Sequence, residues 1–101
     1  MAEIEVTEVE VQTRLKITCD TIAEVVEEAV KHAERGVIAI ACGFIDEAGD
    51  SFLSRFETKT EPYTAEQIAA KLTTKLALEV GLAADEGRTV SRFVALLKLS
   101  K

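Results

Sequence analysis

The sequence contains no tryptophan, one proline and one histidine, and only two of its 101 residues are cysteine. So few cysteines exclude a disulfide-rich scaffold, and a single histidine leaves a zinc site short of ligands. We therefore expect no metal and no cofactor. No apolar run approaches the roughly 20 residues that a membrane-spanning helix needs, so we also expect no membrane partner.

Hydrophobic residues make up 48% and charged residues 30% of the chain, as in an ordinary globular protein. At this length we expect a single domain, residues 1–101. The opening Met-Ala-Glu-Ile-Glu lacks the basic and apolar stretches of a secretory signal, so we expect a cytoplasmic location. Cys19 and Cys42 are then expected to be free thiols in the core.

Charge is distributed unevenly along the chain. The net charge is −6, but residues 1–50 hold 4 Lys and Arg against 12 Asp and Glu, whereas residues 51–101 hold 8 against 6. The acidic balance argues against nucleic acid as a partner, because nucleic-acid binding needs a concentrated basic surface. Opposite charge in the two halves favours association between copies, so we expect a homodimer.

The first third of the chain predicts strand material followed by a helix. Residues 9–19 alternate apolar and polar side chains, which is typical of a half-buried strand. Ile4 and Val6 alternate in the opposite phase, which predicts either a bulge near residues 7–8 or a separate short strand. A capping-box pattern and helical apolar spacing then predict a helix over residues 21–35.

The middle of the chain predicts a hairpin. Residues 37–45 are apolar on both faces, which indicates a strand in the middle of a sheet. The polar segment 46–50 contains a glycine and predicts a turn, after which residues 51–60 predict the returning strand.

The last third predicts a second helix and one ambiguous segment. Thr64 and Gln67 form a capping-box pattern before a helix over residues 65–80, which we expect Gly81 to end. Residues 88–100 fit both strand and helix spacing, and their β-favourable opening favours a closing strand. The resulting order, β-α-β-β-α-β, predicts an α+β fold in which a sheet of about four mainly antiparallel strands carries two helices on one face.

Residues that could carry chemistry are few. Asp46, Glu47 and Asp50 cluster at the predicted turn but lack the spacing of a calcium loop, so we interpret them as solvated. His32 follows Glu28 by four residues, which is an ordinary surface pair on a helix. We therefore expect no catalytic residue and no enzymatic activity.

Four glutamates near the start, Glu3, Glu5, Glu8 and Glu10, are the candidate partner-binding residues. Acidic residues on an exposed edge strand protect it from aggregation. They are also suited to docking on a basic partner or a second subunit, or to imitating the phosphates of a nucleic acid.

Residues 27–49 contain a helix that ends in glycine, an apolar strand and an Asp-x-x-Gly turn, in EEAVKHAERGVIAIA and FIDEAG. This arrangement resembles small uncharacterised proteins of phages and prophages. It is also similar to the helix–hairpin–helix core of roadblock-type domains, which dimerise and bind partners without catalysis. The resemblance implies a phage-encoded accessory protein and carries over no functional residue.

Together these features predict a small non-enzymatic protein that recognises a protein partner through its surface and forms a homodimer. One alternative is a ligand sensor or enzyme with a pocket between sheet and helices. Another is an acidic nucleic-acid mimic that inhibits a basic partner.

Overall fold

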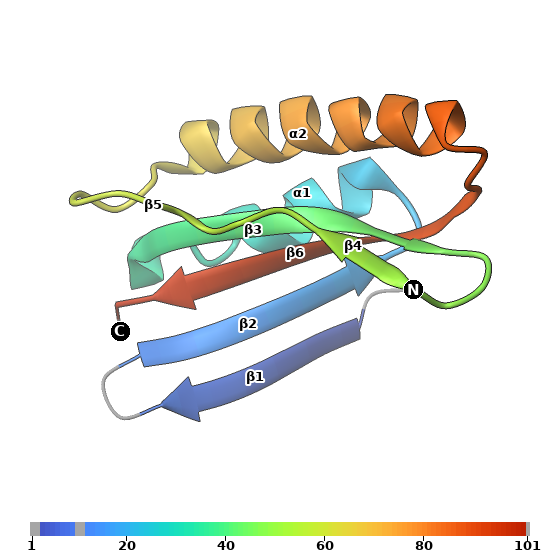
Figure 1. The fold of residues 1–101 in the computed structure, drawn as a ribbon. Coiled ribbons are helices and arrows are strands. Elements are labelled where there is room, and N and C mark those ends of the chain that lie inside the picture. Colours follow the sequence, from blue (N-terminus) through green and yellow to red (C-terminus); the bar gives the residue numbers. More distant parts are fainter. Residues whose placement is uncertain (1–2, 10–11, 101) are drawn as a thin grey trace.

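The computed structural model describes the backbone of residues 3–9 and 12–100 and the side chains of residues 3–6 and 13–100. Its elements follow one another along the chain as shown in Figure 1. They are β1 (Glu3–Val9), β2 (Gln12–Cys19), α1 (Ile22–Val30), η1 (Ala33–Arg35), β3 (Val37–Asp46), β4 (Ser51–Leu53), β5 (Glu57–Thr58), α2 (Ala65–Asp85) and β6 (Val90–Leu99).

The strands form one antiparallel sheet in the order β1-β2-β6-β3-β4, with β5 also paired to β3. Since β2 and β3 both run antiparallel to β6, they run parallel to each other, and the connection through α1 passes over β6. Both helices lie on the same side of the sheet (Figure 1). The predicted α+β fold is confirmed, although the sheet has six strands and not about four.

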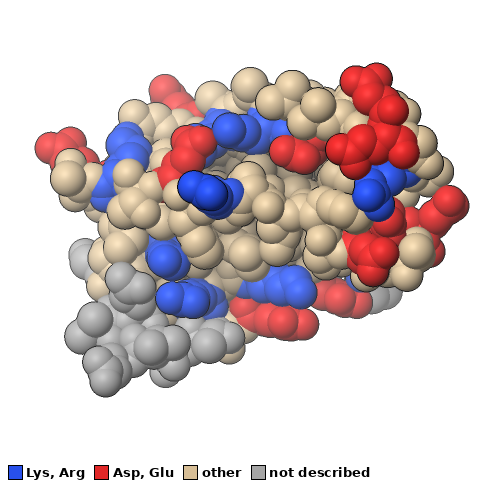
Figure 2. Space-filling model, in the orientation of Figure 1, with Lys and Arg blue, Asp and Glu red and all other residues tan. Residues whose placement is uncertain are grey.

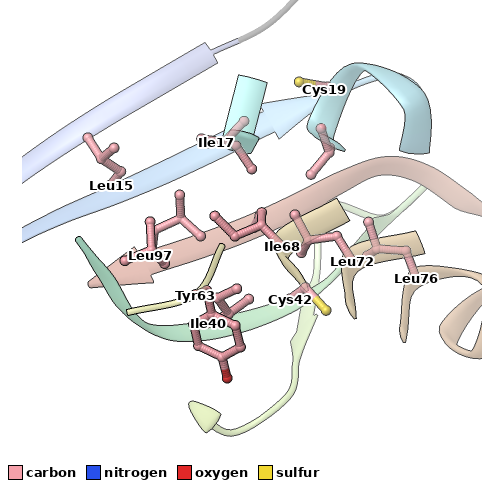
Figure 3. Close-up of a cluster of buried hydrophobic side chains, with 14 of the residues drawn as sticks. Leu15, Ile17, Cys19, Ile40, Cys42, Tyr63, Ile68, Leu72, Leu76 and Leu97 are labelled. Carbon is pink, nitrogen blue, oxygen red and sulfur yellow. The ribbon is translucent and has the colours of Figure 1, made fainter. Parts of the chain in front are cut away.

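The core lies between this side of the sheet and the two helices. Alternate residues of β2, β3 and β6 point toward the helices, and the apolar stripes of α1 and α2 cover them (Figure 3). Its buried members are Leu15, Ile17, Cys19, Val25, Ala29, Val37, Ile40, Cys42, Tyr63, Ile68, Leu72, Leu76, Ala95, Leu97 and Leu99.

The N-terminal strand is separate, as one of the two alternatives predicted. The register between β1 and β2 is continuous from Glu3 opposite Thr18 to Val9 opposite Gln12, so residues 7–8 hold no bulge. Val9 therefore belongs to β1 and not to a strand over 9–19. The change of phase arises because the chain reverses between the two strands.

The first helix is shorter than predicted. α1 ends at Val30. At the end of the predicted span the chain forms η1, a 3₁₀ turn with hydrogen bonds between residues i and i+3. This tighter turn brings the chain back toward the sheet, and Gly36 completes it at φ 76°.

The second helix is longer than predicted, because Gly81 does not end it. α2 continues to Asp85, and the chain turns at Gly87, where φ is 72°. Beyond Gly81, the side chain of Ala83 is 2% exposed. Burial of Ala83 offsets part of the roughly 1 kcal/mol that glycine costs inside a helix.

The predicted central hairpin is present, but its returning strand is broken. β3 covers the predicted 37–45 and one residue more, whereas β4 and β5 replace a continuous strand over 51–60. The regular pairing with β3 is interrupted at Ser54. Its hydroxyl oxygen accepts a hydrogen bond from the backbone N–H of Cys42, and its own backbone N–H donates to the carbonyl oxygen of Cys42.

The C-terminal segment is a strand, as favoured by its opening. β6 occupies the middle of the sheet between β2 and β3, a position predicted for residues 37–45. Both strands are interior, and β3 is the more buried of the two.

Candidate interaction edge

β1 is an edge strand of the sheet, at the end opposite β4, and lies at the bottom in Figure 1, away from α2. Ile4 and Val6 pair with Ile17 and Leu15, so their side chains lie on the side of the sheet that carries the helices. The helices do not extend over β1, and Ile4 and Val6 are 44% and 58% exposed. The strand thus carries two large apolar side chains in contact with solvent.

The opposite side of β1 is acidic. Glu3 and Glu5 are exposed there, beside Thr18 and Lys16 of β2. The backbone of Glu8 continues the same strand, but its side chain lies outside the described residues, as does the whole of Glu10. The structure therefore places two of the four candidate side chains, and both lie on this edge strand.

Arg92 connects this edge to the rest of the molecule. Its Nη1 lies 3.1 Å from Oε1 of Glu3, and its Nε lies 3.4 Å from Oδ1 of Asp20. Its Nη2 donates to the carbonyl oxygen of Thr18 at 3.5 Å. The hydrogen bond to Glu3 raises the pKa of Arg92. Sequence reasoning missed this role, because the partners of Arg92 lie on other segments of the chain.

In the acidic turn, Asp46 holds the backbone through hydrogen bonds. Oδ1 of Asp46 accepts hydrogen bonds from the backbone N–H groups of Ala48 and Asp50, at 3.0 and 2.9 Å. Its Oδ2 lies 3.5 Å from Nη1 of Arg88, whose guanidinium also lies over the ring of Phe52 at 4.1 Å. Asp46 is therefore buried in the turn, contrary to the prediction that the whole cluster is solvated.

Burial shifts the pKa values of the Cys19, Cys42 and His32 side chains. Burial raises the pKa values of the Cys19 and Cys42 thiols, which keeps them protonated. Burial, with a smaller effect of Arg35, lowers the pKa of His32. Among the side chains of residues 3–6 and 13–100, no three from His, Cys, Asp or Glu lie close enough to hold a metal ion.

The basic side of α2 is bound to the sheet. Lys71 and Lys75 both form ion pairs with Glu57 of β5, and the Lys75 pair measures 3.2 Å. Burial, followed by the charge of Lys75, lowers the pKa of Lys71. These two lysines therefore hold the broken returning strand against α2. Neither helix of the described chain is long and apolar enough to cross a membrane.

Two hollows lie outside the core. One, of about 240 Å³, lies on the side of the sheet opposite the helices, which we call the open face. The other, of about 440 Å³, lies beside Lys59, Tyr63 and the first half of α2. Neither is the predicted pocket between the sheet and the helices.

Comparison with known proteins adds no assignment, since the chain matches no family model and no curated protein.

Proposed function

We propose that this protein is a non-enzymatic binding protein that takes up an extended segment of a protein partner at the outer edge of β1. The observation that carries this proposal is the position of β1. It ends the sheet, so one row of its backbone N–H and C=O groups has no partner strand. Strand addition satisfies such groups and is a recurrent mode of peptide recognition.

The side chains of β1 define the chemistry of the partner. A strand added to the edge would place alternate residues beside Ile4 and Val6, whose exposed surfaces favour apolar neighbours. The remaining residues would lie beside Glu3 and Glu5, which favour lysine or arginine. The partner segment therefore alternates basic and apolar residues.

Charge makes a second copy of this chain a poor occupant of the same edge. Two paired β1 strands would bring Glu3 and Glu5 of both copies onto one ladder, where like charges repel. The predicted homodimer remains a prediction and would have to use another surface. Light scattering after size-exclusion chromatography measures it directly.

Nucleic-acid mimicry is the weaker alternative. A mimic needs uncompensated negative charge, but Glu3 is already paired with Arg92. Mimicry nevertheless makes a distinct prediction, because DNA would then compete with the acidic edge for its partner.

A peptide panel tests the proposal. A peptide of alternating lysine and valine, matched to the length of β1, is compared with a glutamate–valine peptide and with one that groups its lysines at one end. We expect amide NMR shifts confined to residues 3–9 and 12–18 with the first peptide only. Binding should weaken as salt rises, because exposed charges are screened over about 8–10 Å.

Matched variants on β1 and α2 distinguish binding at the β1 edge from nonspecific effects of charge and hydrophobicity. We expect Val6→Thr and Glu5→Gln each to weaken binding, whereas Val80→Thr and Glu66→Gln, at exposed positions of α2, leave it unchanged. Equal binding of the acidic peptide, or equal loss in the α2 variants, would contradict strand addition at β1.

A further inference from the structure

The hollow on the open face lies where four segments meet. It is lined by Glu5 of β1, Arg14, Leu15 and Lys16 of β2, Leu96 and Leu97 of β6, and Phe56. In the view of Figure 2, basic side chains lie beside acidic ones over the lower strands, and further acidic side chains concentrate at the right end of the molecule.

Two alanines of β3 lie on the open face opposite larger side chains of β6. Leu96 pairs with Ala41, and Lys98 pairs with Ala39, so each larger side chain of β6 has an alanine beside it on the open face. Phe56 lies in the break between β4 and β5, and the Lys98 ammonium is 4.2 Å from its ring centroid. The hollow thus has an apolar floor and a cationic rim.

The rim cations are available to a ligand. Arg14 and Lys16 form no ion pair with any other described side chain. Together they outnumber Glu5, the one acidic residue among the described residues that line the hollow, in a protein whose net charge is −6. A concentration of positive charge at a hollow attracts anions.

From this geometry we propose that the hollow binds a small organic anion, in which an apolar body carries a carboxylate or phosphate group. Arg14 and Lys16 would hold the anionic group, because guanidinium and ammonium groups donate charge-assisted hydrogen bonds to both kinds of oxygen. Leu96 and Phe56 would contact the apolar body. A volume of about 240 Å³ selects a ligand smaller than the drug-sized molecules that fill pockets of roughly 300–1,000 Å³.

This proposal goes beyond partner binding at β1 and does not depend on it. Ligand in the hollow should shift the amides of residues 96–98 together with 14–16, whereas strand addition at the edge should shift residues 3–9 and 12–18 and leave 96–98 unchanged. Failure of one proposal is therefore distinguishable from failure of the other.

The test uses four probes that share one apolar body: 2-naphthoate, 2-naphthyl phosphate, neutral 2-naphthalenemethanol and cationic 2-naphthylmethylamine. Each is titrated into the full chain and followed by amide NMR. We expect both anions to bind, and the neutral and cationic compounds to bind about tenfold more weakly, because hydrogen bonds to charged groups contribute on the order of that factor. Stronger binding of either anion identifies the preferred group.

Two variants locate the site. Arg14→Gln combined with Lys16→Gln should weaken binding of the anions about tenfold. The matched control, Lys31→Gln combined with Arg35→Gln, makes the same change in net charge on the helical side and should leave binding unchanged. Phe56→Leu removes the ring without removing a charge, and it should weaken naphthoate but not inorganic phosphate.

Three results would overturn the proposal. They are equal binding of the neutral compound, equal weakening by the control pair, and no shift at residues 14–16 and 96–98 with either anion. Urea unfolding of each variant verifies that it is folded before its binding is compared.

Discussion

At the scale of single residues, Asp46 shows how a carboxylate stabilises a turn. It is 7% exposed, and its oxygens accept bonds from two backbone N–H groups and pair with Arg88. Asp46→Ala leaves these donors without an acceptor, so we expect the free energy of unfolding to fall by about 1–3 kcal/mol. Urea denaturation measures the loss. Glu47→Ala, at an exposed neighbouring position, serves as control and should change it by less than about 0.5 kcal/mol.

His32 provides a pH-dependent contribution to stability. Burial and Arg35 lower its pKa in the folded state below the ordinary value of 6.5, despite an opposing effect of Glu28. As the pH falls below 6.5, the unfolded chain binds a proton that the folded protein binds only at lower pH, so stability is lost over that window. His32→Gln should remove this loss. Unfolding of both proteins in urea between pH 8 and 5.5 measures the difference, and parallel curves would contradict the assignment.

At the scale of elements, two glycines have opposite roles. A Cβ at Gly43 would overlap the carbonyl oxygen of Phe52, because β3 and β4 approach closely there. Gly81 lies inside α2 with nothing near its missing side chain. We therefore expect Gly43→Ala to lower the free energy of unfolding by about 1–3 kcal/mol and Gly81→Ala to raise it by about 0.5–1 kcal/mol. Each of these two glycine-to-alanine variants is the control for the other. Urea unfolding measures both, and a change of the same sign in their free energies of unfolding would contradict this account.

The helices and strands differ in how far local sequence determines them. The capping box of α2, from Thr64 to Gln67, is present as predicted, because it needs only residues three apart. The end of α2 was predicted wrongly, because burial of Ala83 depends on the packed domain. The break at Ser54 likewise depends on Cys42, twelve residues away.

At the scale of the whole molecule, the two thiols report on global unfolding. Cys19 and Cys42 lie on β2 and β3 with β6 between them. Two strand spacings amount to roughly 9.5 Å, beyond the roughly 7 Å that a disulfide can bridge. We expect neither thiol to react with a thiol reagent in the native protein and both to react in denaturant. The rate of labelling against urea concentration checks this, and rapid native labelling would contradict burial.

The edge of β1 could be predicted from the sequence to a greater extent than the hollow. Glu3 and Glu5 were identified from their alternation and charge, and the structure places them on an edge strand. The ion pair between Glu3 and Arg92 joins residues far apart in the chain. The hollow on the open face joins three strands and Phe56, so local spacing could not reveal it.

The amino-acid sequence by itself determined the α+β class, the helix starts and the central turn, because caps, glycines and apolar periodicity act over a few neighbouring residues. Only the tertiary structure decided that β6 lies between β2 and β3, that β1 is left at the edge, and that Arg14, Lys16 and Leu96 share a hollow. These features arise from hydrogen bonding and burial between distant segments, which local sequence patterns do not encode.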